Sequence, residues 1–385
     1  MFAKTLQKGL AARKPSMITA AAAAQSRSYT TSDMVDLRSD TVTRPCQKMR
    51  DAMANSVVGD DMYDDCPTTH KLQKDIAKLL GKEAAIITAS GCMANSMALM
   101  TICPKRGDSL VLGNWSHVVN YERGAMGMAG IMPWVLANEE DGTMPLDQMV
   151  KAFSFIPANE HIVAMQGATL ESPHNNKSGR VLRTDYISKV KKIVKKAKGK
   201  LHLDGARSWN AAMFLGLEMK DMVKDFDLVS VCLSKGLGCP LGSLLVGSEK
   251  DILEARNYRK MLGGAMRQTG TFAACGLVAL MDWEEKITQD NLNAAWLAEE
   301  LDSTSGIIVE PELVETNILR FHIQPEMLKK MKTDYHGFVA RLREEEGILA
   351  NSGFANDYVR FVTHRDVSRA DCERVIKAVK SMTSV

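Results

Sequence analysis

Short runs of apolar and β-branched residues recur along the chain, and stretches with helical periodicity separate them. In the first two thirds of the sequence these runs lie at residues 85–88, 109–112, 162–165, 201–203 and 228–233. Between the third and fourth runs, residues 186–200 place apolar side chains at the spacing of one helix face. Strands that alternate with helices predict an α/β fold with a mainly parallel central sheet covered by helices on both faces.

The pattern changes after about residue 282. Helical stretches become longer, and the candidate strands at residues 317–322 and 358–362 are weaker. We therefore expect a large α/β domain over residues 34–285 and a smaller C-terminal α/β domain over residues 286–385. The sequence shows no internal repeat and no low-complexity linker in this part.

The first 32 residues differ from the rest. They are rich in Ala, Ser and Thr and contain five basic residues but no acidic one, and Phe2, Leu6 and Leu10 follow one another at intervals of four. This composition is typical of an amphipathic organellar transit peptide and predicts a mitochondrial location for a body that begins near residue 34. A disordered tail on a cytoplasmic protein is the alternative.

Composition narrows the class of protein. The chain has 385 residues, of which 45% are hydrophobic and 25% charged, and this excludes disordered, collagen-like and disulfide-scaffold classes. The net charge of +3 comes from the N-terminal segment, because the remainder carries 44 basic and 46 acidic residues. A nearly neutral body argues against a nucleic-acid partner, so the seven lysines of residues 186–200 are expected to form a solvated helix face.

No apolar run approaches the ~20 residues that span a bilayer, so no membrane partner is expected. The eight cysteines form no CxxC pair, and no histidine stands at zinc-ligand spacing. They predict reduced thiols and no metal site.

Polar residues follow each of the five candidate strands. Ligands of open α/β sheets bind beyond the carboxyl ends of the strands, so these residues are candidates for one site. They are Gly91 and Cys92 after the first strand, His117 after the second, Glu171 and His174 after the third, Asp204 and Arg207 after the fourth, and Ser234 and Lys235 after the fifth. Each alone could be a cap, a turn or a surface charge, and only their convergence favours a site.

The glycine-rich segment at residues 236–242 resembles a dinucleotide-binding loop. Such a loop must open a helix, whereas Pro240 and a β-like run at residues 243–246 follow here. A nicotinamide cofactor is therefore not expected. A lysine, an aspartate and a phosphate-binding turn instead suit pyridoxal phosphate, which needs an amine for its Schiff base, a carboxylate for its ring nitrogen and donors for its phosphate.

The arrangement of motifs resembles that of the low-specificity L-threonine aldolases. The matching segments are residues 36–43 (DLRSDTVT), His117, residues 204–207 (DGAR), 233–237 (LSKGL), 260–268 (KMLGGAMRQ) and 362–364 (VTH). The resemblance extends from about residue 35 to residue 382. It implies a pyridoxal-phosphate enzyme of the aspartate-aminotransferase fold (fold type I) that assembles as a homotetramer with active sites shared between subunits.

The resemblance also implies roles for individual residues at the cofactor. Lys235 matches the Schiff-base lysine, Asp204 the partner of the ring nitrogen, and His117 the histidine stacked on the ring. Gly91, Cys92 and Ser234 match residues at the phosphate, where the family usually has threonine at the position of Cys92.

Further residues match the family's substrate site. Ser39 and Arg360 match the carboxylate-binding pair, Arg207 lies near the ring hydroxyl and the substrate carboxylate, and His174 faces the substrate side chain. Lys260 and Arg267 match residues that the family offers to a neighbouring subunit's site, Arg267 at the phosphate. Pro173 replaces the family's usual threonine before His174.

The implied activity is retro-aldol cleavage of L-threonine or L-allo-threonine to glycine and acetaldehyde, with His117 and His174 sharing the role of base. Three alternatives remain open. A β-eliminating lyase or a transaminase would use the same Lys235 and Asp204, Cys92 and Pro173 could mark a weakly active relative, and the lysine-rich helix face could serve an interaction module.

Overall fold

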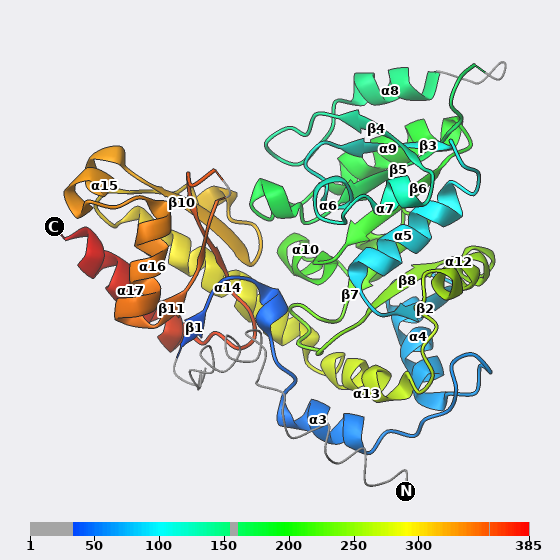
Figure 1. The fold of residues 1–385 in the computed structure, drawn as a ribbon, viewed down its shortest axis with the longest axis horizontal. Helices are drawn as coiled ribbons and strands as arrows, with labels where there is room; N and C mark the ends of the chain where they lie inside the picture. Colours follow the sequence, from blue (N-terminus) through cyan, green and yellow to red (C-terminus); the bar gives the residue numbers. More distant parts are fainter. Residues whose placement is uncertain (1–33, 155–160, 354, 385) are drawn as a thin grey trace, which may run out of the picture. The chain divides into compact units, whose positions relative to one another are not determined.

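The computed structural model describes residues 34–154, 161–353 and 355–384. The larger region of the structure is built around a seven-stranded sheet (Figure 1). All neighbouring strands are parallel except β8, which is antiparallel to both of its neighbours. The strands, in spatial order, are β2 (Ala84–Thr88), β8 (Ser243–Gly247), β7 (Leu228–Cys232), β6 (Lys200–Gly205), β5 (Met165–Glu171), β3 (Ser109–Gly113) and β4 (Met132–Leu136).

Side chains of this sheet alternate between two hydrophobic cores, because successive residues of a strand point to opposite faces. On β3, Leu110 and Leu112 belong to one core and Val111 to the other. The Leu110 core includes residues of α5 (Gly91–Ile102), α6 (His117–Asn120), α7 (Ala125–Met128) and α12 (Glu249–Met261). The Val111 core includes residues of α3 (Gln47–Ala54), α4 (Pro67–Leu79), α8 (Leu146–Ser154), α9 (Thr184–Lys196), α10 (Ser208–Leu215), α11 (Met219–Met222) and α13 (Gly270–Ala279).

A second, antiparallel sheet forms around a third core. Its order is β12 (Asn351–Ser352), β13 (Val359–Val362), β10 (Ile318–Ile323) and β9 (Ile307–Ile308). Helices α15 (Pro325–Met331), α16 (Tyr335–Glu346) and α17 (Arg369–Thr383) contribute to this core. The strand β1 (Val35–Asp36) pairs in parallel with β11 (Ile348–Leu349), so Val35 and Leu37 also pack there.

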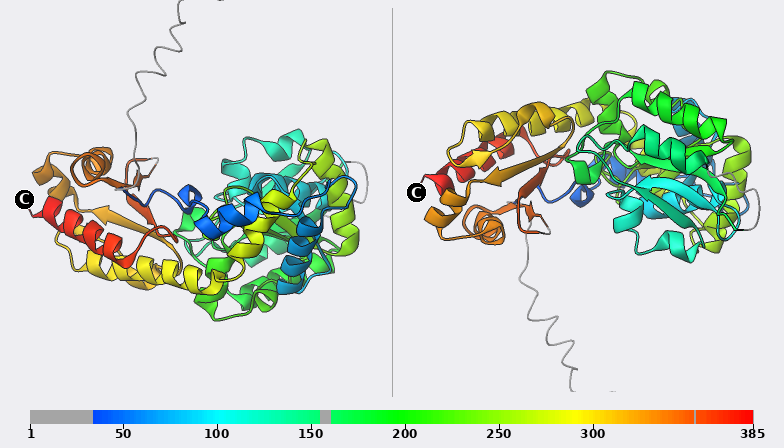
Figure 2. Two further views of the ribbon diagram at one scale, coloured as in Figure 1. Left: turned by 90° about the horizontal axis from the view of Figure 1, so that it is seen from below. Right: turned by 90° about the horizontal axis from the view of Figure 1, so that it is seen from above.

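Helix α14 (Trp283–Asp302) connects the two regions (Figure 2). Near its N-terminus, Trp283 and Ile287 belong to a core of the large sheet, whereas Leu297 and Leu301 belong to the third core. The domain boundary expected between residues 285 and 286 falls inside this continuous helix and stays a prediction.

The α/β fold with a mostly parallel sheet is confirmed, but the third strand was wrongly placed at residues 162–165. Ile162 and Val163 are exposed, and β5 begins at Met165 and continues to Glu171. Polar residues of β5 are buried with hydrogen-bond partners, as Thr169 is with His202, and an apolar pattern does not detect such a strand.

The edge strand β4 was not predicted, since Pro133 interrupts it and four of its five residues are exposed. No helix within the described ranges is long and apolar enough to span a membrane. No disulfide joins the eight cysteines, all of which lie in those ranges. The expected transit peptide lies outside the described residues.

Candidate active site

The carboxyl edge of the large sheet brings most of the predicted site residues together. Asp204 lies near the end of β6, Glu171 is the last residue of β5, and His117 begins α6 after β3. Lys235 follows β7 by three residues, and Gly91 begins α5 after β2. These five strands run in the same direction, so the segments that follow them meet at one edge.

Asp204 is a buried carboxylate with fixed donors. Its side chain accepts a hydrogen bond from Asn95 Nδ2 at 2.9 Å and another from the backbone N–H of Ala206 at 3.2 Å. The same Asn95 nitrogen donates to Glu122 Oε1 at 2.9 Å, and this oxygen lies 3.0 Å from Nδ1 of His117. One amide group therefore links Asp204 to the His117–Glu122 pair.

The hydrogen bond between His117 and Glu122 joins two groups whose pKa values are both raised. Burial opposes the charge of His117, but the hydrogen bond to Glu122 and the charges of Asp204 and Glu171 raise its pKa. Burial raises the pKa of Glu122, while its hydrogen bond to His117 acts in the opposite direction. The backbone N–H of His117 donates to Glu171 Oε2 at 2.7 Å, which fixes the start of α6.

The charges of neighbouring site residues shift the pKa of the Cys92 thiol. Burial raises the pKa of its thiol to about 11, Glu122 and Asp204 add to this rise, and Lys235 opposes it. The carbonyl of Lys235 accepts hydrogen bonds from Thr43 Oγ1 at 2.9 Å and from the N–H of Gly238 at 2.8 Å, so the loop that carries this lysine is tied at its base.

Cys92, His117 and Glu122 each place a possible metal-ligand atom within 4.8 Å of one another, although the sequence indicated no metal site. These atoms line the predicted cofactor site, and the His117–Glu122 hydrogen bond already satisfies two of them. We therefore assign this cluster to the cofactor site.

Arg207 is paired with Asp40, a residue that sequence reasoning did not single out. Its Nε and Nη2 donate to the two oxygens of Asp40 at 2.7 and 2.8 Å, and both residues are buried. Although burial raises the pKa of Asp40, Arg207, Lys235 and Asn317 together hold it well below its usual range. Arg207 Nη1 donates to Asn175 Oδ1 at 3.1 Å, so each of the three guanidinium nitrogens has a hydrogen-bond acceptor.

Arg360 points at the same asparagine but has no acidic partner among the described residues. Its Nη2 donates to Asn175 Oδ1 at 2.9 Å and its Nη1 to the carbonyl of Arg38 at 3.2 Å. Burial lowers its pKa to about 10, and the charge of Arg207 adds to the effect. Ser39, two residues before Thr41, accepts a hydrogen bond from the Thr41 N–H and caps the short helix η2 (Asp40–Val42).

The phosphate-turn residues form the start of α5. A Cβ on Gly91 would lie 2.9 Å from Cys232 Sγ, so glycine fits here and a larger residue requires a shift. Ser90 caps the helix by accepting from the N–H of Met93 at 3.2 Å. The N–H groups of Gly91 and Cys92 belong to the first turn, which lacks intrahelical acceptors and carries the positive end of the helix dipole. Ser234 is half-buried in the adjacent loop.

His174 does not join the network of Asp204. Its side chain is 1% exposed, neither ring nitrogen has a hydrogen-bond partner, and Nδ1 lies 4.0 Å from Glu171 Oε1. Its ring packs against the turn at Gly142, where an added Cβ would lie 3.0 Å from the histidine. Of the two predicted histidines, only His117 is hydrogen-bonded into the site.

Lys260 and Arg267 lie on the surface. Lys260 is exposed on α12, and Arg267 is 60% exposed and forms an ion pair with Asp60 at 3.1 Å. No hydrogen bond or ion pair joins either side chain to the site within the described residues. Their service to a neighbouring subunit stays a prediction.

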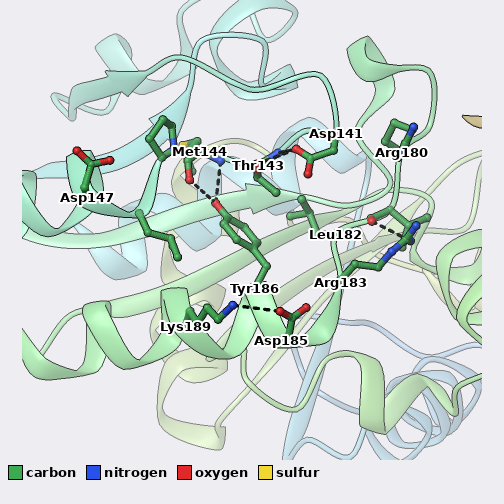
Figure 3. A pocket seen from close by; sticks show the side chains of 13 residues that line it. Asp141, Thr143, Met144, Asp147, Arg180, Leu182, Arg183, Asp185, Tyr186 and Lys189 are labelled. Carbon is green, nitrogen blue, oxygen red and sulfur yellow. Dashed lines mark hydrogen bonds and ion pairs between the residues drawn. The ribbon is translucent and has the colours of Figure 1, made fainter.

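A separate pocket lies beside α9 and contains none of the predicted site residues (Figure 3). The hydroxyl group of Tyr186 bonds to the backbone N–H and carbonyl of Met144 in this pocket. Nearby, Arg183 pairs with Glu315 at 2.6 Å. The bonds satisfy these groups within the chain, and they identify no chemistry for the pocket.

Four residues of the site escaped sequence reasoning: Asp40, Asn95, Glu122 and Asn175. Asp40 stands inside the 36–43 motif, where its burial was not visible. Asn95 gave a usable signal, because it is an amide among the mostly apolar buried residues of its helix. Glu122 and Asn175 lie in polar turns and gave none.

Comparison with known proteins places this geometry in a family. Residues 36–324 match the family model described as beta-eliminating lyase. The chain is 40% identical over 354 residues to the probable low-specificity L-threonine aldolase 2 of Arabidopsis thaliana, covering 92% of this chain and 98% of that protein. It is 38% identical over 343 residues to the low specificity L-threonine aldolase of Escherichia coli, covering 89% and 97%.

Solved structures share the fold at lower identity. The threonine aldolase of Leishmania major superposes with a TM-score of 0.76 at 18% identity, covering 91% of this chain and 100% of that one. A putative L-allo-threonine aldolase of Listeria monocytogenes superposes with a TM-score of 0.73 at 20% identity, covering 91% and 97%. The chain belongs to the beta-eliminating lyase family, and within that family it groups with the low-specificity L-threonine aldolases.

Proposed function

We propose that this protein is a pyridoxal-phosphate-dependent aldolase that cleaves L-threonine and L-allo-threonine between Cα and Cβ to glycine and acetaldehyde. Relatives at 38–40% identity over most of the chain carry the name of this activity. The observation that carries the proposal is the buried carboxylate of Asp204, which lies at the same sheet edge as the tied Lys235 loop.

The residues present fit pyridoxal phosphate. Asp204 offers a buried carboxylate to a protonated ring nitrogen, Lys235 offers an amine, and the start of α5 at Gly91 offers N–H donors to the phosphate. His117 stands at the same edge with a ring that can cover the cofactor. When bound, pyridoxal phosphate supplies an electron sink for the bond that breaks at the substrate Cα.

Substrate orientation falls to Arg360 and Ser39. A half-buried guanidinium without an acidic partner among the described residues binds a carboxylate strongly, because the carboxylate supplies the charge and the acceptors that the protein leaves out. Asp40 balances the positive charge of Arg207 in an ion pair, so the positive charge left for the substrate is that of Arg360. A carboxylate held there directs the scissile bond of the substrate in a fixed direction.

His117 moves the proton of the β-hydroxyl group. Its Nδ1 faces Glu122, which leaves Nε2 as the nitrogen that can accept a proton. Glu122, which Asn95 holds by a hydrogen bond, orients the ring and stabilises its charged form. The sequence indicated a role shared with His174, and the burial of His174 favours His117 as the acting base.

The assembly and location are proposals as well. Exposed Lys260 and Arg267 match residues that serve a neighbouring subunit in the family, which supports a homotetramer with shared sites. The basic, acid-free N-terminal segment supports delivery to mitochondria.

Product analysis tests the activity. The purified protein, loaded with pyridoxal phosphate, is incubated with L-threonine and L-allo-threonine side by side. We expect glycine and acetaldehyde in equal amounts from both. Ammonia and a 2-oxo acid would instead show β-elimination, and the proposal would then be wrong.

A further inference from the structure

The carboxylate subsite contains more positive charge than its acids balance. Asn175 lies where three arginines meet: Arg207 and Arg360 donate to its Oδ1, and Arg320 Nη2 lies 3.4 Å from its carbonyl oxygen. Arg320 stands opposite Arg360 in the register of β10 and β13, so both side chains emerge from the same face of that sheet. Among the described residues, Asp40 is the one acid that forms an ion pair with any of the three.

The atom on which Arg207 and Arg360 converge is neutral. A side-chain amide oxygen accepts two charge-assisted hydrogen bonds and so orients both guanidinium groups, but it cancels neither charge. The backbone N–H of Asn175 donates to Glu171 Oε1 at 2.8 Å, which fixes the asparagine from the side of β5. The acceptor is thus rigidly placed and uncharged.

We propose that Asn175 is a specificity-determining residue of the carboxylate subsite. Its neutral oxygen orients Arg207 and Arg360 and leaves the charge of Arg360 available for the α-carboxylate of an amino acid. The inference rests on the proposed function, to which it adds how the site selects α-amino acids over their uncharged analogues.

The absence of charge at residue 175 is the property that should leave Arg360 available to the substrate carboxylate. The change Asn175→Asp tests this property alone, because it adds a charge and little else. An aspartate there keeps the size and the acceptor of the asparagine but pairs with Arg360, so it takes the place of the substrate carboxylate and repels it. The folded protein gains an ion pair, while the ligand loses its partner. Stability and binding therefore change in opposite directions, which a purely structural role of Asn175 would not produce.

Binding of glycine and glycinamide to the holoenzyme measures this without any cleavage step. The cofactor absorbance reports both dissociation constants, and their ratio gives the preference for a carboxylate. We expect Asn175→Asp to reduce this preference at least tenfold, with a melting temperature at or above that of the wild type and unchanged affinity for pyridoxal phosphate. Asn175→Ala removes the acceptor without adding charge, and it should keep a preference for glycine.

The neighbouring Asn176 supplies the matched control. Its Oδ1 accepts from the hydroxyl of Tyr121 at 2.9 Å, and no hydrogen bond joins it to an arginine of the described residues, so Asn176→Asp should leave the preference within twofold of wild type. Equal loss in Asn175→Asp and Asn176→Asp, an unchanged preference in Asn175→Asp, or a preference abolished in Asn175→Ala would each overturn the proposal. Failure of the wild type to cleave threonine would overturn the proposed function and leave this binding test intact.

Discussion

Asp204 is the residue on which, in the proposed function, the chemistry of the site depends most. It is 3% exposed, and the protein surrounds it with donors from Asn95 and Ala206. These donors hold the carboxylate in a fixed position. A carboxylate is the partner that a protonated pyridine ring requires.

The change Asp204→Asn should therefore keep the shape and remove the charge. We expect the variant to bind some cofactor but to lose at least about 100-fold in kcat, which corresponds to roughly 2.7 kcal/mol of barrier. Steady-state cleavage of threonine at saturating pyridoxal phosphate measures this loss. Activity within twofold of the wild type would remove Asp204 from the mechanism.

Cys92 offers a second prediction at this scale. A thiol is a weak donor, so the phosphate should depend mainly on backbone N–H groups at the start of α5, on Ser234 and on Arg267 of a neighbouring subunit. Cys92→Thr should tighten cofactor binding by about 0.5–1.5 kcal/mol, the contribution of one ordinary hydrogen bond, with little change in turnover. Titration of the apo forms with pyridoxal phosphate measures it.

Cys92→Val is the control, because valine has the shape of threonine without its hydroxyl group. The valine variant should not bind the cofactor more tightly than the wild type. Equal tightening by valine and threonine would attribute the effect to shape, and weaker binding by threonine would contradict the donor argument.

Some residues of the site could be predicted from the sequence, and others could not. Asp204 lies near the end of a strand, and Lys235 and His117 follow strands by three and four residues, so the rule on strand ends located all three at the site. Asn95 holds Asp204 and Glu122 through contacts with residues 109 and 27 positions away in the chain. No local pattern encodes such a contact.

At the scale of elements, β6 contains a buried histidine in a position that makes the sheet sensitive to acid. Nδ1 of His202 lies 2.8 Å from Thr169 on β5, and Nε2 lies 2.9 Å from Ser230 on β7. Burial lowers the pKa of His202 to about 4, although the charge of Asp204 acts against this. The neutral ring thus joins three neighbouring strands.

The consequence for stability has a definite sign. The folded protein keeps His202 neutral down to about pH 4, whereas the unfolded chain protonates it near pH 6.5. The contribution of the neutral His202 to the free energy of unfolding is therefore complete above pH 6.5 and is lost as the pH falls towards 4. Between pH 7 and pH 5 the loss is about 2 kcal/mol.

The change His202→Gln tests this at the level of the sheet. Glutamine offers a donor and an acceptor but does not titrate. We expect the free energy of unfolding in urea to fall less for the variant than for the wild type between pH 7 and pH 5, even if the variant is less stable at pH 7. Parallel pH profiles would show that His202 does not titrate in this window.

Elements with a clear apolar pattern were predictable, and those without one were not. The strands at residues 85–88, 109–112 and 228–233 matched because both faces of each are buried. The strand β5 was displaced because buried Thr169 and Glu171 interrupt its pattern, and β4 was missed because its position at the edge leaves it exposed. In both cases contacts with other segments decided the structure.

At the scale of the whole molecule, the proposed sharing of sites between subunits predicts complementation. Lys235→Ala and Arg267→Ala should each be inactive alone, because one removes the cofactor lysine and the other removes a group offered to the neighbour. When the two variants are mixed equally, about half of the subunit pairs contain one subunit of each variant. One of the two sites in such a pair has both Lys235 and Arg267, so about a quarter of the wild-type activity should return.

The experiment requires unfolding the two variants together and refolding them in equal amounts. A mixture of each variant with itself serves as the control for refolding yield. A mixture that stays inactive although hybrid assemblies have formed would show that Arg267 does not act across subunits.

We expect Lys235 to hold the cofactor beside Asp204 at the edge of the large sheet. Reduction of the holoenzyme with sodium borohydride makes the bond between pyridoxal phosphate and a lysine permanent, and peptide mapping by mass spectrometry then locates it. We predict the added mass on the peptide containing Lys235, and no such mass in Lys235→Ala. Labelling of another lysine in the wild type, with Lys235 unmodified, would contradict the account.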